Sequence, residues 1–267
     1  MRLITAPKLI VATTSAVLID QPLKQYLVGR MDSDLGFSLD LIPEIAGRTC
    51  YQSFSKPRPG GQGEYLNNIL QSGHGSVLEH ASVGFIITGV SRSLTHEFVR
   101  HRAGFAYSEL SQRYYEPEEP AFVLPPLALE NPAMRNALED GFANVFSEYQ
   151  ALVVIGTKYE SEKWQAENPN DQPTRKDLTL IRKRARESAR AMLPNATETH
   201  IFATGNLRAW RHFVELRGSI HADLEIRRLA VMIAKQLKAS APNVFQDIST
   251  MRDADGRESV FACYTKV

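Results

Sequence analysis

Apolar residues recur every three or four positions along much of the chain, the spacing that places them on one face of an α-helix. The longest such run begins at Pro132 and extends to about Ala166, and it predicts one long amphipathic helix. Shorter runs of the same kind predict helices over residues 40–51, 65–72, 91–102, 176–192, 207–217 and 221–239. Ser91 is the expected N-cap of the third of these, and Gly104 is expected to end it.

Segments rich in β-branched and aromatic residues predict strands instead. They are residues 82–90, residues 199–204, and residues 7–19, which form one strand or a hairpin. Glycine and proline predict a loop at 53–63, a turn at 73–80 and irregular chain at 116–132. Without an internal repeat or clear linker, the sequence predicts a single mixed α/β domain spanning residues 1–267.

Composition narrows the possible classes of protein. A formal net charge of +1 gives no overall basic field of the kind that non-specific nucleic-acid binding requires. The chain contains no apolar run long enough to span a membrane, and its N-terminus does not resemble a signal peptide. With two cysteines far apart, Cys50 and Cys263, a disulfide framework is not expected. We therefore expect a reduced, cytoplasmic protein without membrane contact.

Candidate chemistry is concentrated between Arg100 and Tyr115. Cations, hydroxyls and aromatic rings alternate there in a mixture suited to a phosphate and a planar heterocycle; they include Arg100, His101, Arg102, Ser108, Ser111, Arg113, Tyr114 and Tyr115. The chain has neither a P-loop nor a Gly-x-Gly-x-x-Gly motif, so any nucleotide is held in another way.

All seven histidines fall within residues 74–101 and 200–221, which predicts that the two windows meet at one site. The histidine spacing includes no His-Glu-x-x-His, and neither cysteine lies near a histidine-rich window, so no protein-bound metal is predicted. Cys50 has no histidine within twenty residues and is interpreted as structural. In the second window, Arg208, either Arg211 or His212, and Glu215 would share one helix face, which solvent exposure explains almost as well as ligand binding.

These residues point to an enzyme that binds phosphorylated heterocycles. The alternative is a non-catalytic nucleotide- or RNA-binding module that uses the arginine clusters as an anion groove. Steep salt dependence of RNA affinity would distinguish that module. Near-neutral net charge and clustered histidines count against it.

Arg100-His101-Arg102, followed by Ser111-Gln112-Arg113-Tyr114, resembles the R-H-R-x7-S motif of flavin-dependent thymidylate synthases. The resemblance extends from about Ala46 to Ala239, and residues 1–40 diverge from it. Eight residues rather than seven separate Arg102 from Ser111. The extra residue is expected near Gly104, because glycine tolerates positive φ.

The resemblance implies an α+β subunit with a mixed sheet flanked by long helices, the fold of thymidylate synthase-complementing proteins. It also implies a homotetramer whose active sites are shared between subunits. The implied activity is reductive methylation of dUMP to dTMP. In that reaction 5,10-methylenetetrahydrofolate supplies the carbon, and NADPH supplies electrons through FAD.

Site residues carried over by position from the resemblance fall into three groups. FAD contacts are implied for Ser76, Glu79, Arg100, His101, Arg102, Asn206, Arg208 and His212. Contacts to dUMP are implied for Glu97, Glu109, the backbone of Leu110, Ser111, Arg113, Arg190 and Arg217, with Glu97 standing where other members have glutamine. Arg217 would grip the uracil ring and Ser111 the phosphate, while His74 would lie near the flavin and assist proton transfer or folate placement.

Overall fold

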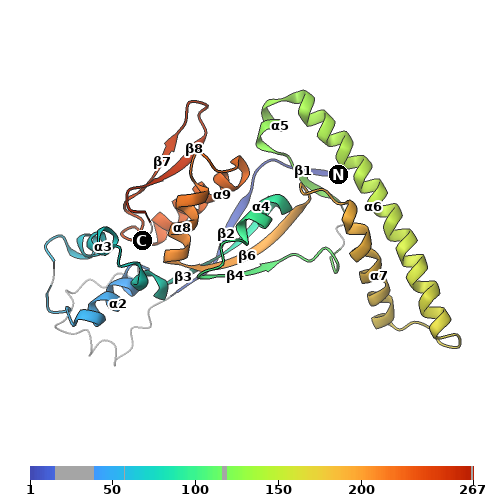
Figure 1. Ribbon diagram of the computed structural model, residues 1–267, viewed down its shortest axis with the longest axis horizontal. Helices are drawn as coiled ribbons and strands as arrows, with labels where there is room; N and C mark the ends of the chain where they lie inside the picture. Colours follow the sequence, from blue (N-terminus) through green and yellow to red (C-terminus); the bar gives the residue numbers. More distant parts are fainter. Residues whose placement is uncertain (16–38, 57, 116–118, 266) are drawn as a thin grey trace. The chain divides into compact units, whose positions relative to one another are not determined.

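The computed structural model describes residues 1–15, 39–56, 58–115, 119–265 and 267, and it divides the chain into two compact units (Figure 1). Unit 1 consists of Met1–Ala6, Thr88–His96 and Glu109–Ile201. Unit 2 consists of Pro7–Ile87, Glu97–Ser108 and Phe202–Val267. The expectation of a single domain stays a prediction.

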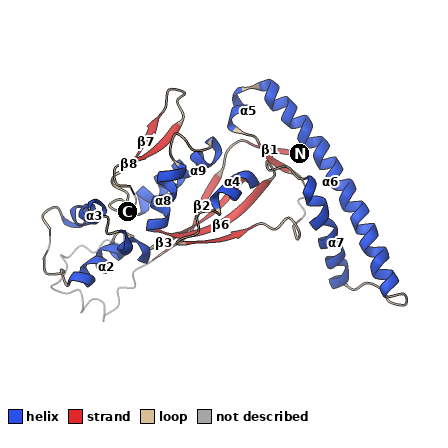
Figure 2. Ribbon diagram, in the orientation of Figure 1, coloured by secondary structure: helices blue, strands red, loops and turns tan. Residues whose placement is uncertain are grey.

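A four-stranded sheet has the strand order β2-β3-β6-β4 (Figure 2). Its strands are β2 (Lys8–Thr14), β3 (Ser82–Ser91), β6 (Glu198–Asn206) and β4 (Phe105–Glu109). The last three each contribute residues to both units. Strands β2, β3 and β6 lie where β-branched and aromatic residues predict them, although residues 16–19 of the first predicted segment lie outside the described residues.

Unit 1 is built on a helical hairpin. Its helices are α5 (Pro126–Glu130), α6 (Pro132–Glu167) and α7 (Arg175–Ala189), followed by the short 3-10 helix η2 (Arg190–Met192). Helices α6 and α7 lie side by side in Figure 1, and Gly156 permits their close approach, since a Cβ there would lie 3.2 Å from the Cα of Ala185. Thr174 and Asp177 form a capping box at the start of α7.

The core of unit 1 packs Phe122, Leu124, Ala128 and Phe142 together. Strands β1 (Arg2–Ile4) and β5 (Ala121–Val123) pair in parallel beside it. The prediction of irregular chain at 116–132 is therefore wrong for β5 and α5. Pro126 lies in the first turn of α5, where backbone N–H groups have no partner within the helix. The missing N–H of a proline therefore costs no hydrogen bond there.

Unit 2 contains α2 (Leu41–Tyr51), α3 (Gly61–Gln71), η1 (Gly75–His80), α8 (Leu207–Arg217) and α9 (Leu224–Ser240), and also the antiparallel hairpin of β7 (Ile248–Arg252) and β8 (Glu258–Ala262). Aromatic rings fill its centre around Trp210, which is fully buried and donates from Nε1 to the carbonyl of Val83 at 2.9 Å. Phe85, Phe98 and Phe213 surround the indole with centroids 5.1–6.1 Å away.

Helix α4 (Arg92–Phe98) ends earlier than predicted. The chain leaves the helix through turn bonds from the N–H of Arg100 to the carbonyl of Glu97 and from the N–H of His101 to that of Phe98. Its start is confirmed, because the Ser91 hydroxyl accepts the N–H of Leu94 at 3.0 Å. The early end frees the Arg100-His101-Arg102 segment from helical geometry.

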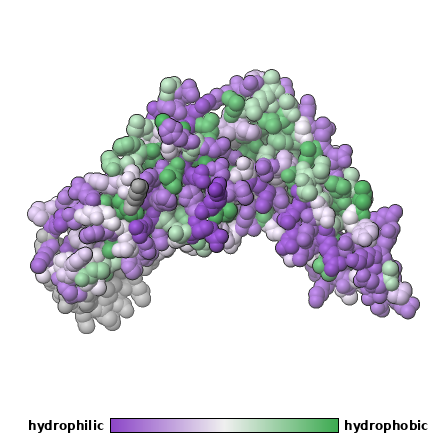
Figure 3. All heavy atoms as spheres, viewed as in Figure 1, coloured by the Kyte–Doolittle hydropathy of each residue, from purple (hydrophilic) through white to green (hydrophobic). Residues whose placement is uncertain are grey.

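Apolar side chains remain exposed on α6. Leu152, Val154, Ile155 and Tyr159 lie on its surface, and apolar residues are visible over this part of the molecule in Figure 3. Val154 and Ile155 are 68% and 64% exposed. Adjacent apolar side chains at such exposure are typical of a surface that another protein covers.

Candidate active site

Helix α8 presents candidate site residues because its two faces differ in chemistry. Asn206 caps it, since the side-chain oxygen accepts the N–H of Ala209 at 2.8 Å. Trp210 and Phe213 anchor the buried face, and Arg208 and His212 lie on the more exposed one. The helix therefore holds both candidate flavin residues on a rigid support.

Arg211 belongs to the core rather than to this site. Its guanidinium pairs with both carboxylate oxygens of Asp247 at 2.8 and 3.0 Å, and both side chains are less than 5% exposed. Of the two residues that sequence left open for the exposed face, the structure places His212 there. A buried, bidentate arginine is a structural ion pair, and its removal would leave a carboxylate uncompensated.

Arg217, at the end of α8, lies at the centre of a polar cluster in unit 2. Its Nη1 contacts Oε2 of Glu97 at 2.7 Å, and its Nε donates to Nε2 of His101 at 2.9 Å. The Arg217 and Glu97 side chains are 24% and 31% exposed, so the pair remains accessible. The structure thus brings Arg217 together with two candidate residues, Glu97 and His101, that lie 120 and 116 residues earlier in the sequence.

The contact with Arg217 requires a neutral imidazole at His101. An arginine N–H can only donate, so Nε2 of His101 must be the unprotonated nitrogen. Burial, the Arg217 charge, His212 and Arg100 together lower the pKa of His101 to about 4. Geometry and electrostatics therefore favour the same protonation state.

This pKa predicts acid-sensitive folding. Between about pH 6.5 and pH 4 the unfolded chain binds a proton at His101 that the folded chain excludes, so the free energy of unfolding should fall as the pH falls through this range. The expected loss is about 1–3 kcal/mol. Thermal unfolding of the wild type and of His101→Gln, each compared at pH 7 and pH 4.5, measures it. Equal acid-induced losses in Tm for both proteins would contradict the prediction.

The chain between Arg102 and Phe105 forms a tight turn. The N–H of Phe105 donates to the carbonyl of Arg102, and Gly104 has a φ of +75°. A glycine at positive φ in the third position is typical of a type II turn. Gly104 thus has the positive φ expected of it, and the location of the extra residue of the motif at this turn stays a prediction.

Tyr107 is a site-supporting residue that sequence reasoning missed. Its hydroxyl lies 2.7 Å from the backbone carbonyl of His101 and 3.2 Å from that of Phe98. Burial raises its pKa, so the phenol stays protonated and can donate. The alternation of Phe105, Tyr107 and Glu109 is the signal that would have indicated strand β4 and the inward direction of this ring.

Arg208 forms a second polar contact in unit 2. Its Nη1 pairs with Oε1 of Glu79 at 2.6 Å, and its Nε donates to the carbonyl of Val267 at 3.2 Å. Glu79 belongs to η1, where Ser76 is also exposed, and His74 is exposed immediately before it. The two segments implied to contact FAD thus meet through an ion pair.

Arg100 and Arg102 are exposed cations for which no anionic partner is found among the residues that the structure describes. Two arginines separated by one residue suit a pyrophosphate, which both guanidinium groups can approach as bidentate donors. This donor set, together with Asn206 and Arg208, fits the phosphates and ribose of a dinucleotide such as FAD.

The residues implied to bind the dUMP phosphate lie in unit 1. Arg113 pairs with Glu187 at 3.3 Å, but both are 37% or more exposed, so an anion can compete for the guanidinium. The Ser111 hydroxyl accepts the N–H of Arg113 at 3.4 Å and keeps its own proton available. Arg190 is exposed in η2. This cluster has the composition of a phosphate site.

Glu109 and Leu110 are more constrained than the resemblance implies. Oε1 of Glu109 contacts Thr95, Thr199 and Arg92 at 2.9–3.2 Å. The N–H of Leu110 is used by strand pairing, since it donates to the carbonyl of His200 at 2.9 Å. Both residues therefore position the chain that carries Ser111.

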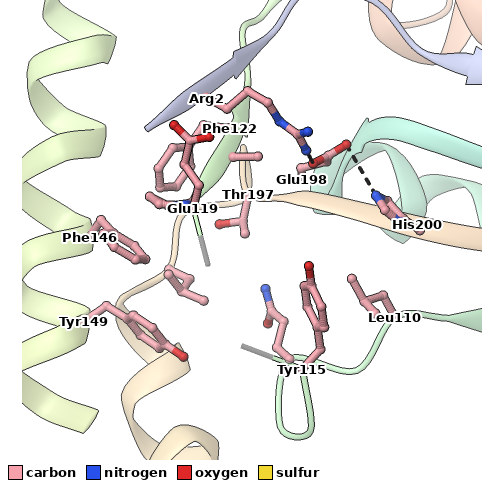
Figure 4. Close-up of a pocket in the computed structure, with 14 residues that line it drawn as sticks. Arg2, Leu110, Tyr115, Glu119, Phe122, Phe146, Tyr149, Thr197, Glu198 and His200 are labelled. Carbon is pink, nitrogen blue, oxygen red and sulfur yellow. Dashed lines mark hydrogen bonds and ion pairs between the residues drawn. The ribbon is translucent and has the colours of Figure 1, made fainter. Parts of the chain in front are cut away.

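A small cavity of about 90 Å³ lies beside this chain in unit 1 (Figure 4). Phe122, Phe146 and Tyr149 form its apolar wall, and Glu198 lies at its edge, where it binds Arg2 at 2.7 Å and lies 3.5 Å from His200. Of the residues implied to contact dUMP, Leu110 lines this cavity, and Ser111, Arg113 and Arg190 are not among its lining residues.

The predicted meeting of the two histidine windows is confirmed for one pair. The rings of His101 and His212 lie 6.0 Å apart in unit 2. Tyr114 is 59% exposed, and the charges of Arg113 and Lys183 lie over its ring. Within the described part of the chain, none of the helices combines the length and apolar character needed to cross a bilayer.

Solved structures with a similar fold include the UMP/dUMP methylase PolB from Streptomyces cacaoi bound with 5-Br UMP, with a TM-score of 0.65 and 21% identity. The match covers 92% of this chain and 95% of that one. The same enzyme bound with 5-Br dUMP matches at 20% identity with an equal TM-score. The mixed helix and sheet fold expected from the sequence is confirmed.

Sequence comparisons give a closer relationship. The family model described as thymidylate synthase complementing protein matches residues 39–243. The flavin-dependent thymidylate synthase of Mycobacterium sp. (strain JLS) is 48% identical over 219 residues, which are 81% of this chain and 83% of that protein. The enzyme of the same name from Mycobacterium tuberculosis (strain H37Ra) is 45% identical over 248 residues, 89% of this chain and 94% of that protein. The chain belongs to the flavin-dependent thymidylate synthase family of thymidylate synthase complementing proteins.

Proposed function

We propose that the chain converts dUMP to dTMP, with 5,10-methylenetetrahydrofolate as the carbon donor and with NADPH and FAD as the source of reducing equivalents. The observation that carries the proposal is the position of Arg217 in a chain of this family. Its guanidinium is held at two points by Glu97 and His101, and the remaining N–H groups are available to a planar ligand.

Arg217 would act on the uracil ring as a fixed cation. C5 becomes nucleophilic toward the carbon donor when the pyrimidine carries enolate-like negative charge, and a preorganised donor stabilises that charge without reorganisation of the site. Glu97 and His101 hold the guanidinium before substrate arrives, so little conformational freedom of Arg217 is lost on binding.

FAD would be held by the exposed arginines of unit 2. Arg100 and Arg102 would neutralise its pyrophosphate, while Arg208, ordered by Glu79, and the Asn206 side chain would contact its polar groups. His212 and Ser76 lie on the same two segments, and His74 precedes them. When bound and reduced, the flavin supplies the hydride.

The phosphate of dUMP would bind the unit 1 cluster. Arg113 and Arg190 supply charge, and the Ser111 hydroxyl donates to a phosphate oxygen. Phosphate binding would draw Arg113 away from Glu187, an exposed partner that holds it weakly. The threonine and arginine contacts of Glu109 fix the chain on which these groups depend.

A homotetramer with shared active sites would complete the arrangement. The exposed apolar side chains of α6, Leu152, Val154 and Ile155 among them, need a covering surface, and a second copy of the chain provides one. Ligand groups would then come from more than one subunit.

Purified protein tests the proposal directly. We expect a yellow protein with flavin absorbance near about 450 nm. It should form dTMP from dUMP only when both NADPH and methylenetetrahydrofolate are present, and omission of either should abolish product. A protein that retains no FAD and does not exchange the C5 hydrogen of dUMP would refute the proposed function.

A further inference from the structure

Some N–H groups of Arg217 donate to the protein, and the others have no acceptor among the described residues. A guanidinium carries five N–H groups. Within the described residues, one of them is directed to His101 and one to Glu97. Both contacts are short, and together they fix the plane of the guanidinium as well as its position. The direction of the remaining N–H groups therefore depends on these two acceptors.

His101 is itself held from three sides. Tyr107 donates its hydroxyl to the backbone carbonyl of His101 at 2.7 Å. The imidazole meets the ring of Phe213 edge-on at 5.3 Å, and the His212 ring lies 6.0 Å away. Phe213 is fully buried. The acceptor nitrogen therefore occupies a defined place relative to α8, the helix that carries Arg217.

Glu97 differs from His101 in charge. It is a partly exposed carboxylate, and under the proposed function it would stand beside an anionic substrate. A neutral acceptor orients the guanidinium without neutralising it, whereas a carboxylate also reduces its net attraction for substrate. The charge of Arg217 therefore stays available to the substrate only if His101, the neutral acceptor, provides much of the orientation of the guanidinium.

We propose that His101 is a positioning residue for Arg217, in which Nε2 accepts the N–H of Nε and aims the other guanidinium N–H groups at the pyrimidine. This inference rests on the proposed function, in which Arg217 contacts the uracil ring. It gives His101 a role toward dUMP that differs from the flavin contact implied by the resemblance.

Two substitutions at His101 separate the acceptor from the ring. In His101→Leu the acceptor is lost, and dUMP affinity of the FAD-loaded protein should fall about tenfold. In His101→Gln the side-chain oxygen replaces Nε2, and most of the affinity should return. Calorimetric titration with dUMP measures affinity, and flavin absorbance measures FAD content in the same samples. His96→Leu, at an exposed position of α4, is the matched control and should bind dUMP as the wild type does.

A double-mutant cycle with Arg217→Ala tests whether His101 acts through Arg217. If it does, His101→Leu should weaken dUMP binding in the wild-type background but have no further effect once Arg217 is absent. Independent, multiplicative losses in the double variant would overturn the inference. So would an unchanged dUMP affinity in His101→Leu accompanied by loss of FAD.

Failure of this inference is distinguishable from failure of the proposed function. If the wild type forms dTMP and the cycle shows no coupling, the function stands and the role of His101 is refuted. If the wild type forms no dTMP when FAD, NADPH, dUMP and methylenetetrahydrofolate are all present, the proposed function itself is refuted.

Discussion

Arg217→Ala is expected to lower the rate of dTMP formation by about 10²–10³-fold, while FAD content stays at the wild-type level. Loss of one preorganised donor at a developing negative charge has an effect of this size. FAD should remain because Arg100, Arg102 and Arg208 are not in contact with Arg217 in any hydrogen bond or ion pair that the described residues form. The measurement is turnover under saturating co-substrates, with flavin absorbance recorded on the same preparation.

Arg217→Lys is the informative comparison. Lysine keeps the charge but cannot reach both His101 and Glu97 with a planar fork, so we expect only partial recovery of turnover. Full activity in Arg217→Lys would show that charge alone suffices and that the two contacts are dispensable. Wild-type turnover in Arg217→Ala would refute the assignment of this residue to the reaction.

Gly104→Ala is expected to destabilise the fold by about 2–3 kcal/mol. The φ of +75° costs a residue with a Cβ about 1–2 kcal/mol. The new Cβ would also lie 2.7 Å from Nδ2 of Asn206 and 2.9 Å from the Cβ of Ala209. Displacing Asn206 weakens the cap of α8, which adds about 1 kcal/mol. Because Asn206 is a candidate FAD contact, the variant should also retain less flavin.

Gly141→Ala is a control that is expected to increase the stability of the fold rather than decrease it. Gly141 lies within α6, where a Cβ meets nothing within 4 Å, and alanine should stabilise the helix by about 1 kcal/mol. Thermal unfolding of both variants measures the difference, with an expected decrease of about 5 °C for Gly104→Ala. If both glycines tolerate alanine equally well, the turn does not need positive φ.

Sequence periodicity predicts the long elements because one property dominates each of them. Helix α6 has a regular apolar stripe and a proline at its start, and its bounds follow closely from that pattern. Helix α9 begins at Leu224 rather than at residue 221, because Asp223 caps it. The ends of helices, which depend on capping residues, are predicted less accurately from sequence than the regular apolar repeat of their middle turns.

The missed strands lack a strong pattern of their own. Residues 248–252 in β7 are mostly exposed, so alternation of apolar residues is weak there, and the strand is stabilised by backbone pairing with its neighbour β8 in the hairpin. Strand β4 contains charged and aromatic site residues and pairs with β6, which is distant in sequence.

The candidate site was predictable as a set of residue types but not as a set of contacts. The family resemblance implies an FAD contact for His101 and a dUMP contact for Arg217, yet only the fold shows that one accepts a hydrogen bond from the other. Likewise, sequence offers Arg211 and His212 as alternatives on one helix face, and the buried partner Asp247 decides between them. Because Arg211 and Asp247 are 36 residues apart, their pairing produces no pattern in the local sequence.

The Arg102–Phe105 turn is an exposed corner before strand β4, and pairing is regular beyond it, as the bond from Leu110 to His200 shows. The extra residue of the motif is expected at this corner. Insertions at this point are absorbed by a solvent-facing corner rather than transmitted along the strand. A fixed count of residues between Arg102 and Ser111 is therefore a poor criterion for membership of the family. Relatives with still longer corners should retain both clusters wherever the corner keeps a glycine at positive φ.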